Sequence, residues 1–438
     1  MPRAVVIGLG VTGPPVCRHL QGLGFDVVVV EDRPSSASAT HALELGVDLV
    51  PGPSDDTLRS LIAGSDLLAP NPGVPPAHPA FAFARDQGVP VMGEIELGWR
   101  AAQAPIVAIT GSNGKTTVTT LVERMLQASG LRALAAGNIG LPLVEAVARP
   151  GVEVLVVEVS SGQLMTTVDF RPRVATWLNF AEDHLDFHPD MEHYAWAKAR
   201  IWANQGGDDV AVANADDAAV MAALPSPGPR VVTFGAGGEW RVVGDALCAP
   251  DGRAVVAVAD MPRSLPHELG NALAALATTI AAGGDEDAAA QVLREFHGLP
   301  HRVQLVGEAG GVRYYDDSKA TTPASVLAAL SGFDSVVLIA GGRNKGLDLG
   351  VLTAEHRRLR AVVTIGEAGP EVRRAFDGVK PVEMAASMDD AVARATRLAE
   401  PGDVVLLSPG CTSWDAYRNY GERGDDFARA VGEMAGAQ

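Results

Sequence analysis

The stretch that decides the fold is "AITGSNGKTTVTTLVERML", residues 108–126. It predicts a short apolar strand, a tight polar turn and then a helix. Backbone N–H groups at the start of a helix attract anions, Lys115 can neutralise phosphate oxygens, and the Thr116 hydroxyl can bind Mg²⁺. The strict P-loop pattern has glycine where this chain has Ile109. The coincidence of strand, Gly-Lys-Thr and helix still predicts an ATP site; the alternative is a surface turn with a solvated lysine.

Length and composition restrict the class of protein. A chain of 438 residues is too long for one ordinary core, so two or three domains are expected. The net charge of −18 argues against nucleic acid as a partner. No run approaches the ~20 apolar residues that cross a bilayer, and no signal-peptide pattern opens the chain. The three distant cysteines, Cys17, Cys248 and Cys411, fit a reducing cytoplasm. We expect a cytoplasmic monomer that contacts no membrane.

Strand–helix alternation is repeated in three segments, 1–93, 94–297 and 298–438. Continuous Val/Ile/Leu runs such as "VVVV" and "VVLIA" are typical of parallel strands covered on both faces. We therefore predict a three-domain α/β protein: a Rossmann-like N-terminal domain, a central P-loop ATPase-type parallel sheet and a Rossmann-like C-terminal domain. Short β-like runs in 238–262 predict an antiparallel flap on the central domain.

A second glycine-rich turn, "GLGVTG", occupies residues 8–13, and Glu31 and Asp32 end the next predicted strand. This is the dinucleotide-binding arrangement. Three interpretations are open: a turn needed only for tight packing, a site for a nucleotide diphosphate, and an NAD site. No later motif supplies the acid or base of a dehydrogenase, which favours the nucleotide diphosphate.

Acids, histidines and one lysine follow the predicted ATP turn. Glu158 ends the strand of "VVEVSSGQL", where open α/β sheets bind ligands, although an acid that only caps the next turn fits as well. In "NFAEDHLDFH", His184 lies between two acids and is either a metal ligand or structural, whereas we expect His188 on the surface. Lys198 lies among apolar residues of a predicted helix, and by default it is a surface lysine.

Nine motifs, taken in order, resemble the Mur ligases, the ATP-dependent amino-acid ligases of peptidoglycan precursor synthesis. They are "TGSNGKTT", "EVSSGQL", "NFAEDHLDFH", "YAWAKARI", "LGNALAA", "LPHRVQLV", "DDSKATTP", "GGRNKGLDL" and "SPGCTSWDAYRNYGERGDDF". The first glycine turn and the last motif favour the member that adds D-glutamate to UDP-N-acetylmuramoyl-L-alanine through an acyl phosphate. A sister ligase that adds another amino acid, such as L-glutamate, and a non-catalytic P-loop nucleotide-binding protein are the alternatives.

The resemblance implies the roles of individual residues. The set for ATP is Gly111, Ser112, Asn113, Gly114, Lys115, Thr116, Thr117, Asn271, Arg302 and Asp317. The set for Mg²⁺ is Thr116, Glu158, His184 and Lys198, the last carbamylated by CO₂. The set for the UDP substrate is Val11, Thr12, Asp32, Arg33, Asn71, Gly73 and Asn138, of which Asp32 and Arg33 are expected at the uracil end. The set for D-glutamate is Lys319, Thr321, Lys345, Ser413 and Tyr420. The catalytic residues implied are Lys115, Asn138, His184 and Lys198.

Three positions depart from the family pattern. Gly162 stands where a bulky aromatic residue is usual, which puts the local packing in question. Glu268 and Thr322 each stand where asparagine is common, on the ATP side and the amino-acid side of the expected site.

Overall fold

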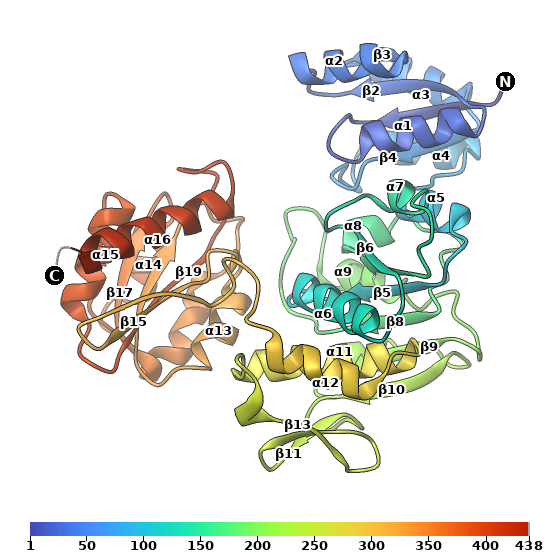
Figure 1. Ribbon diagram of the computed structural model, residues 1–438. Coiled ribbons are helices and arrows are strands. Elements are labelled where there is room, and N and C mark those ends of the chain that lie inside the picture. The colour runs from blue at the N-terminus through green and yellow to red at the C-terminus, as the bar shows by residue number, and fades with distance from the viewer. Residues whose placement is uncertain (437–438) are drawn as a thin grey trace. The chain divides into compact units, whose positions relative to one another are not determined.

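The computed structural model describes residues 1–436 and contains four β-sheets flanked by helices (Figure 1). Three of the sheets are parallel or almost entirely parallel, which confirms the predicted α/β class. The chain divides into two compact units. The first contains Met1–Phe180, Phe187–Ala257 and Asn271–Arg294; the second contains Ala181–Asp186, Val258–Gly270 and the chain from Glu295 onward.

The N-terminal sheet is parallel, with the strand order β3-β2-β1-β4. Its strands are β1 (Arg3–Ile7), β2 (Asp26–Glu31), β3 (Asp48–Pro51) and β4 (Leu67–Pro70). Its helices are α1 (Gly13–Gly22), α2 (Ser36–Leu45), α3 (Asp55–Ala63) and α4 (Pro79–Gln87). A Cβ on Gly13 would lie 2.5 Å from the Gly8 carbonyl oxygen, so glycine is required where α1 meets the turn after β1.

The central sheet is parallel, with the order β10-β9-β8-β5-β7-β6. Its strands are β5 (Ile106–Thr110), β6 (Ala133–Gly137), β7 (Val154–Glu158), β8 (Val174–Trp177), β9 (Val210–Asn214) and β10 (Arg230–Phe234). Every residue of β5, β7 and β8 is buried, as continuous apolar runs predict for strands covered on both faces. The associated helices are α5 (Glu94–Ala101), α6 (Lys115–Ala128), α7 (Leu143–Ala146), α8 (Ser161–Leu164), α9 (Met191–Ala199), α10 (Ala218–Ala222), α11 (Pro266–Ala281) and α12 (Glu286–Glu295).

The predicted antiparallel flap is present as a three-stranded sheet, β11 (Arg241–Val243), β12 (Ala246–Cys248) and β13 (Ala254–Ala257). A short 3₁₀ helix, η1 (Val258–Asp260), follows it.

The C-terminal sheet has the order β14-β15-β19-β16-β17-β18, and only the β14–β15 pair is antiparallel. Its strands are β14 (Gln304–Ala309), β15 (Val312–Asp316), β16 (Val336–Gly341), β17 (Leu359–Ile365), β18 (Val382–Met384) and β19 (Val404–Gly410). Its helices are α13 (Pro323–Leu330), η2 (Leu349–Arg358), α14 (Gly369–Ala375), α15 (Met388–Leu398) and α16 (Tyr420–Gly436). The carboxyl ends of β15, β19 and β16 are therefore neighbours at one edge.

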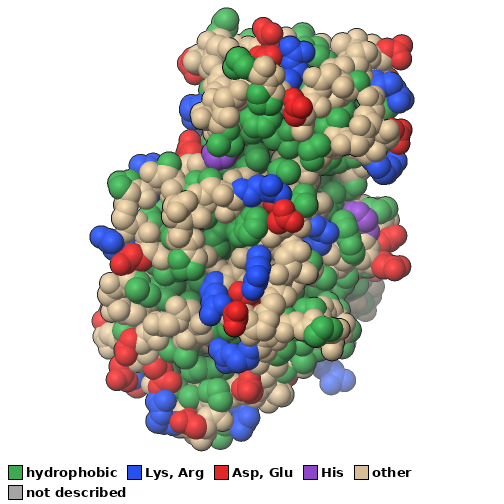
Figure 2. Space-filling view, turned by 90° about the vertical axis from the view of Figure 1, so that its right-hand side faces the viewer, with side chains coloured by type: hydrophobic (Ala, Val, Ile, Leu, Met, Phe, Trp, Pro, Cys, Tyr) green, Lys and Arg blue, Asp and Glu red, His purple; other side chains and the backbone are tan. Residues whose placement is uncertain are grey.

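The surface carries charges of both signs. On the face in Figure 2, lysine and arginine side chains lie between aspartate and glutamate side chains rather than in one basic patch. Among the described residues, 1–436, no helix is long and apolar enough to span a membrane.

Two carboxylates of helix α5 are fully buried. Glu96 accepts the backbone N–H groups of Val168, Asp169 and Phe170. Glu94 is 2% exposed and accepts the N–H of Val144 through Oε1, at 2.9 Å. Its Oε2 has no hydrogen-bond partner among the described residues. Burial raises the pKa of Glu94 from 4.5 to about 7.

This shift makes stability depend on pH. Folded Glu94 keeps a proton that the unfolded chain releases above pH 4.5, so its contribution to stability falls between pH 4.5 and about 7. Glutamine keeps the Oε1 acceptor and cannot ionise. We expect Glu94→Gln to be more stable than wild type at pH 8, by on the order of 2 kcal/mol, and similar at pH 4.5. Denaturant unfolding at both pH values measures this, with the exposed Glu44→Gln as control. A variant no more stable than wild type at pH 8 would contradict it.

Candidate functional site

The turn after β5, the predicted phosphate site, is held in place by Asn179. Asn179, which follows β8, binds it three times: its Oδ1 accepts the Asn113 N–H at 2.8 Å, its Nδ2 donates to the Asn113 carbonyl at 3.1 Å, and its carbonyl accepts the Ser112 N–H at 3.1 Å. Helix α6 then begins at Lys115, so the N–H groups of its first turn face the same edge. The sequence alone does not predict this role of Asn179, because its partners lie more than sixty residues away along the chain.

Gly114 permits a close approach to helix α11. Its φ is +83°, and a Cβ there would lie 2.4 Å from Oδ1 of Asn271. Only glycine fits both constraints. The structure thus brings Asn271 against the P-loop turn, as its expected role beside ATP requires.

Two lysines share one carbonyl oxygen at this turn. Lys115 Nζ donates to the carbonyls of Gly111 and Ser112, at 2.7 and 2.9 Å. Lys198 Nζ donates to the same Gly111 oxygen at 2.8 Å. Lys198 is 1% exposed, and its Nζ lies 4.7 Å from the centroid of the Tyr194 ring. The default interpretation of Lys198 as a surface lysine is therefore wrong.

Glu158 ends β7 beside Ile109 of β5, at the edge that carries the P-loop turn. Its Oε1 accepts a hydrogen bond of 2.8 Å from Nδ2 of Asn138. Its Oε2 is buried and has no hydrogen-bond partner in the described chain. An unpaired buried carboxylate oxygen is costly unless a cation or donor meets it. Glu158 and Thr116, the second residue of α6, both carry oxygen donors of the kind that Mg²⁺ prefers.

A magnesium ion needs few protein ligands, because it keeps waters and binds through one or two carboxylates and substrate phosphates. Across residues 1–436, the structure contains no group of three or more His, Cys, Asp or Glu side chains that could hold a metal ion. Glu158, Thr116 and Lys198 gather around the P-loop edge of the first unit. His184, the fourth predicted ligand, belongs to the second unit.

Asp183 and Lys345 form a buried ion pair within the second unit. Nζ of Lys345 lies 2.9 Å from Oδ1 of Asp183, and the two side chains are 15% and 9% exposed. Burial alone would raise the pKa of Asp183, but the charges of His184 and Lys345 hold it below its usual value. His184 has φ +57°, and its N–H donates to Asp183 Oδ1 at 2.8 Å. Asp183 had no assigned role in the sequence.

His188 is buried, which corrects the expectation of a surface side chain. It is 1% exposed. Its Nε2 lies 2.8 Å from the Ser161 hydroxyl, and its Nδ1 lies 2.9 Å from Nδ1 of His193. The imidazole thus ties the segment after His184 to helices α8 and α9. A pattern of acids and histidines in sequence cannot show this, because both partners lie on other elements.

The N-terminal glycine turn is closed by Asn71, which follows β4. Nδ2 of Asn71 donates to the Gly8 carbonyl at 2.6 Å, and its Oδ1 accepts from the Thr12 hydroxyl. Val11 is 86% exposed at the tip of the turn. Glu31 accepts the Leu9 N–H at 2.9 Å. Three of the predicted UDP-substrate residues are thus brought to one place.

The other residues expected around this turn lie at the ends of neighbouring segments. Asp32, directly after β2, contacts His78 at 3.0 Å. Arg33 and Gly73 are exposed. Asn138 is exposed too, but it binds Glu158 of the central sheet.

Most of the predicted D-glutamate residues follow the three neighbouring strands of the C-terminal sheet. Lys319 and Thr321 follow β15, Lys345 follows β16, and Ser413 follows β19. Reciprocal backbone hydrogen bonds of 2.9 and 3.0 Å between Arg343 and Thr412 bind the last two segments together. Nζ of Lys319 lies 3.8 Å from the centroid of the Tyr420 ring.

The predicted ATP residues of this unit lie beside β15. Asp317 is 6% exposed; its oxygens accept from the Ser408 hydroxyl at 2.7 Å and from the Val303 N–H at 3.3 Å. Burial raises the pKa of Asp317 to about 7. The Asp317 carboxyl is thus already hydrogen-bonded by Ser408 and Val303 of its own unit. The carbonyl of Arg302 accepts a hydrogen bond of 2.8 Å from Arg263.

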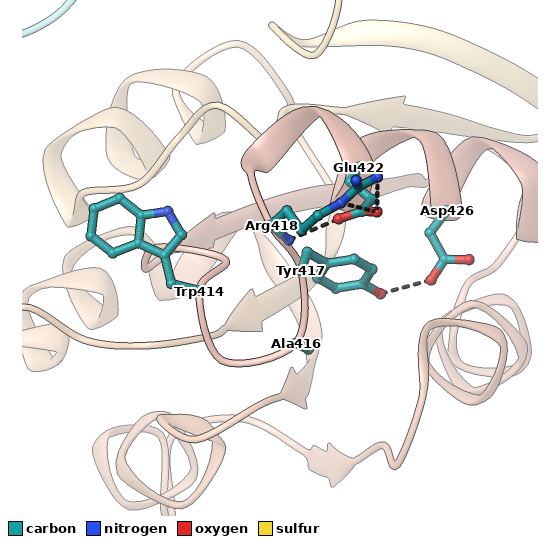
Figure 3. A pocket seen from close by; sticks show the side chains of 6 residues that line it. All are labelled: Trp414, Ala416, Tyr417, Arg418, Glu422 and Asp426. Atoms are coloured by element: carbon teal, nitrogen blue, oxygen red, sulfur yellow. Dashed lines mark hydrogen bonds and ion pairs between the residues drawn. The ribbon is translucent and has the colours of Figure 1, made fainter. Parts of the chain in front are cut away.

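An open pocket of about 670 Å³ lies in the segment after Ser413 (Figure 3). It is lined by Trp414, Ala416, Tyr417, Arg418, Glu422 and Asp426. Its polar groups pair with one another: Arg418 with Glu422, and the Tyr417 hydroxyl with Asp426 at 2.7 Å. It contains none of the predicted site residues.

The three departures from the family pattern have local explanations. A Cβ on Gly162 would lie 3.3 Å from the ring of Phe187, so an aromatic residue from another segment fills this place. Glu268 accepts the Leu265 N–H at 2.9 Å and pairs with Arg263. Thr322 is the N-cap of α13 and accepts from the Ser325 N–H, a role that asparagine also performs.

Comparison with protein families gives three matches that follow one another along the chain. "Mur ligase MurD-like, N-terminal domain" matches residues 2–93, "Mur ligase middle domain" residues 109–279, and "Mur ligase, glutamate ligase domain" residues 301–411. They follow the order of the three predicted domains.

Individual relatives are similar over almost the whole chain. The UDP-N-acetylmuramoylalanine--D-glutamate ligase of Geobacillus kaustophilus is 41% identical, over 99% of this chain and 98% of its own. The proteins of the same name from Shouchella clausii and Thermobifida fusca are 42% and 39% identical, over 97% and 99% of this chain and 95% and 99% of their own.

Solved structures share the fold at lower identity. A pseudomurein peptide ligase type C from Methanothermus fervidus has a TM-score of 0.63 at 19% identity, covering 99% of this chain and 100% of its own. A UDP-N-acetylmuramate-alanine ligase from Thermotoga maritima has a TM-score of 0.60 at 18% identity, covering 100% and 99%.

Proposed function

The chain belongs to the Mur ligase family, and from this premise we propose that it joins D-glutamate to UDP-N-acetylmuramoyl-L-alanine at the expense of ATP, in peptidoglycan precursor synthesis. The observation that carries the ATP-dependent chemistry is the P-loop edge: Lys115 begins the helix after β5, and Glu158, with its unpaired oxygen, ends the adjacent strand β7. The near-full-length similarity to relatives of that name supports the choice of substrates.

The reaction must first activate a carboxylate, which is a poor electrophile. Transfer of the γ-phosphoryl group of ATP to the L-alanyl carboxylate gives an acyl phosphate and ADP. The amine of glutamate then attacks the carbonyl carbon, loses a proton, and phosphate leaves from the tetrahedral intermediate. Lys115 and the N–H groups at the start of α6 stabilise the charge on the transferring group. Asn138, bound to Glu158, positions the acceptor carboxylate beside the same edge.

Magnesium, when bound, supplies Lewis-acid stabilisation of the phosphoryl oxygens. Thr116, Glu158, His184 and a carbamylated Lys198 would hold it. The carbamate reverses an unfavourable arrangement, since two ammonium groups otherwise share the Gly111 oxygen. An ammonium repels Mg²⁺, whereas a carbamate is an anionic oxygen donor of the kind that magnesium prefers.

We assign ATP binding to residues 94–297, with Asn271 beside the P-loop and Arg302 and Asp317 contributed by the next segment. The UDP substrate is assigned to residues 1–93, and D-glutamate to residues 298–438. Lys319 and Lys345 supply two cations for a dicarboxylate, and Thr321, Ser413 and Tyr420 orient it. Because Lys345 is paired with Asp183, a substrate carboxylate must share or replace that partner.

We further propose a monomer in the cytoplasm, where the three buried free cysteines stay reduced.

The amino-acid preference tests this proposal. The enzyme is supplied with ATP, magnesium, UDP-N-acetylmuramoyl-L-alanine and, in turn, D-glutamate, L-glutamate, meso-diaminopimelate or L-lysine at equal concentration. We expect D-glutamate to give the largest yield of the condensed product by mass spectrometry, with one ADP released per product. Another preferred amino acid would overturn the D-glutamate assignment alone. Nucleotide binding without any product would overturn the ligase function in favour of a non-catalytic nucleotide-binding protein.

A further inference from the structure

One loop connects both ends of the N-terminal site. It starts at Asn71, directly after β4, and ends at His78, the N-cap of α4. Asn71 binds the glycine turn after β1, and His78 contacts Asp32 after β2. Since β4, β1 and β2 are consecutive in the sheet, the loop passes over the carboxyl ends of all three strands.

The hydrogen bonds of His78 fix its tautomer. The backbone N–H of Ala80 can only donate, and it lies 3.2 Å from Nδ1 of His78, so Nδ1 carries no proton. The proton of the neutral ring is then on Nε2, which donates to Oδ2 of Asp32 at 3.0 Å. The His78 side chain is 11% exposed, whereas that of Asp32 is 50% exposed. The Nε2–H of His78 therefore fixes the orientation of the Asp32 carboxylate, which remains accessible to a ligand.

We propose that His78 is a positioning residue that orients Asp32 for recognition of the uracil ring; this rests on the proposed function, in which Asp32 binds the uracil end of the UDP substrate. With Oδ2 held by His78, Oδ1 of Asp32 accepts the N3–H of uracil. Cytosine has an acceptor at N3, which faces the carboxylate unfavourably. The fixed orientation thus contributes to selection of uracil over cytosine.

Two substitutions of His78 separate its contact with Asp32 from its role as the N-cap of α4. In His78→Asn, the side-chain oxygen can still accept the Ala80 N–H, but the residue is too short to reach Asp32. In His78→Gln, the amide can reach Asp32, but the N-cap of α4 is lost. We expect His78→Asn to keep the wild-type Tm and to raise KM for the UDP substrate about tenfold, with kcat and the KM values for ATP and D-glutamate unchanged. We expect His78→Gln to lower Tm and to leave KM closer to wild type.

Calorimetric binding of UDP and CDP tests the inference without turnover. Wild type is expected to prefer UDP, and His78→Asn to lose most of that preference. In an Asp32→Asn background, His78→Asn should add nothing, because it acts through Asp32. An unchanged KM and UDP preference in His78→Asn, equal effects of the two substitutions on Tm and KM, or no UDP preference in wild type would each overturn the inference. Selective UDP binding without ligase product would overturn the proposed function and leave His78 assigned.

Discussion

Replacing Lys115 by alanine is expected to slow turnover at least ~10²-fold, a loss of roughly 3 kcal/mol of transition-state stabilisation. The ammonium is held at the start of α6 by the carbonyls of Gly111 and Ser112. It therefore needs little reorganisation to meet phosphoryl oxygens bound at the same N–H groups. The fold should survive, because Lys198 still donates to the Gly111 oxygen and Asn179 still holds the turn.

Steady-state kinetics with all three substrates measure the effect of Lys115→Ala. Binding of the UDP substrate should be unchanged, since its predicted site lies on the N-terminal sheet. Lys380→Ala is the matched control, because Lys380 is the one lysine of the sequence outside the predicted site. Near-normal turnover by Lys115→Ala, or an equal loss in Lys380→Ala, would remove Lys115 from the catalytic residues.

The sequence predicted the parts of the fold whose signals are local. A buried run such as β7, followed by a turn and a helix, is visible in a few adjacent residues, and so is the P-loop turn with Lys115 and Thr116. The flap of β11 to β13 was found for the same reason: short alternating runs are joined by glycine-containing turns. Neighbouring strands of a parallel sheet then place their carboxyl ends, and the residues that follow them, at one edge.

The contacts that hold the site together could not be predicted in this way, because each joins distant parts of the chain. Asn179 and Asn113 are 66 residues apart, and Asp183 and Lys345 are 162 apart. His188, in the loop before α9, is held by the hydroxyl of Ser161 on α8. Each of these side chains could be a metal ligand, a structural group or a surface group, and only its contact partner in the folded chain distinguishes these roles. The same holds for Lys198, whose apolar neighbours in sequence fit a surface lysine lying along its helix as well as a buried one.

Lysine is rare in this protein. Only five of its 35 basic side chains are lysines, and four of these, Lys115, Lys198, Lys319 and Lys345, lie in the predicted site. Arginine therefore supplies nearly all other cations. Arginine cannot form a carbamate, because the reaction requires a neutral primary amine that adds CO₂ and releases a proton. An amine at the buried position 198 therefore fits a carbamate better than a permanent cation.

Lys198→Ala is expected to reduce turnover by ~10³-fold or more, because it removes both the anionic ligand and its fixed position. Acetate supplies a carboxylate of similar shape, and we expect it to restore part of the activity at millimolar concentration. Lys380→Ala should be active and should not respond to acetate.

Carbamylation of Lys198 is measured separately, by ¹³C NMR after equilibration with ¹³CO₂. With five lysines in the chain, wild type should show a carbamate signal that Lys198→Ala lacks. An active Lys198→Ala enzyme, or a signal that survives the substitution, would contradict the assignment of Lys198 as a carbamylated magnesium ligand.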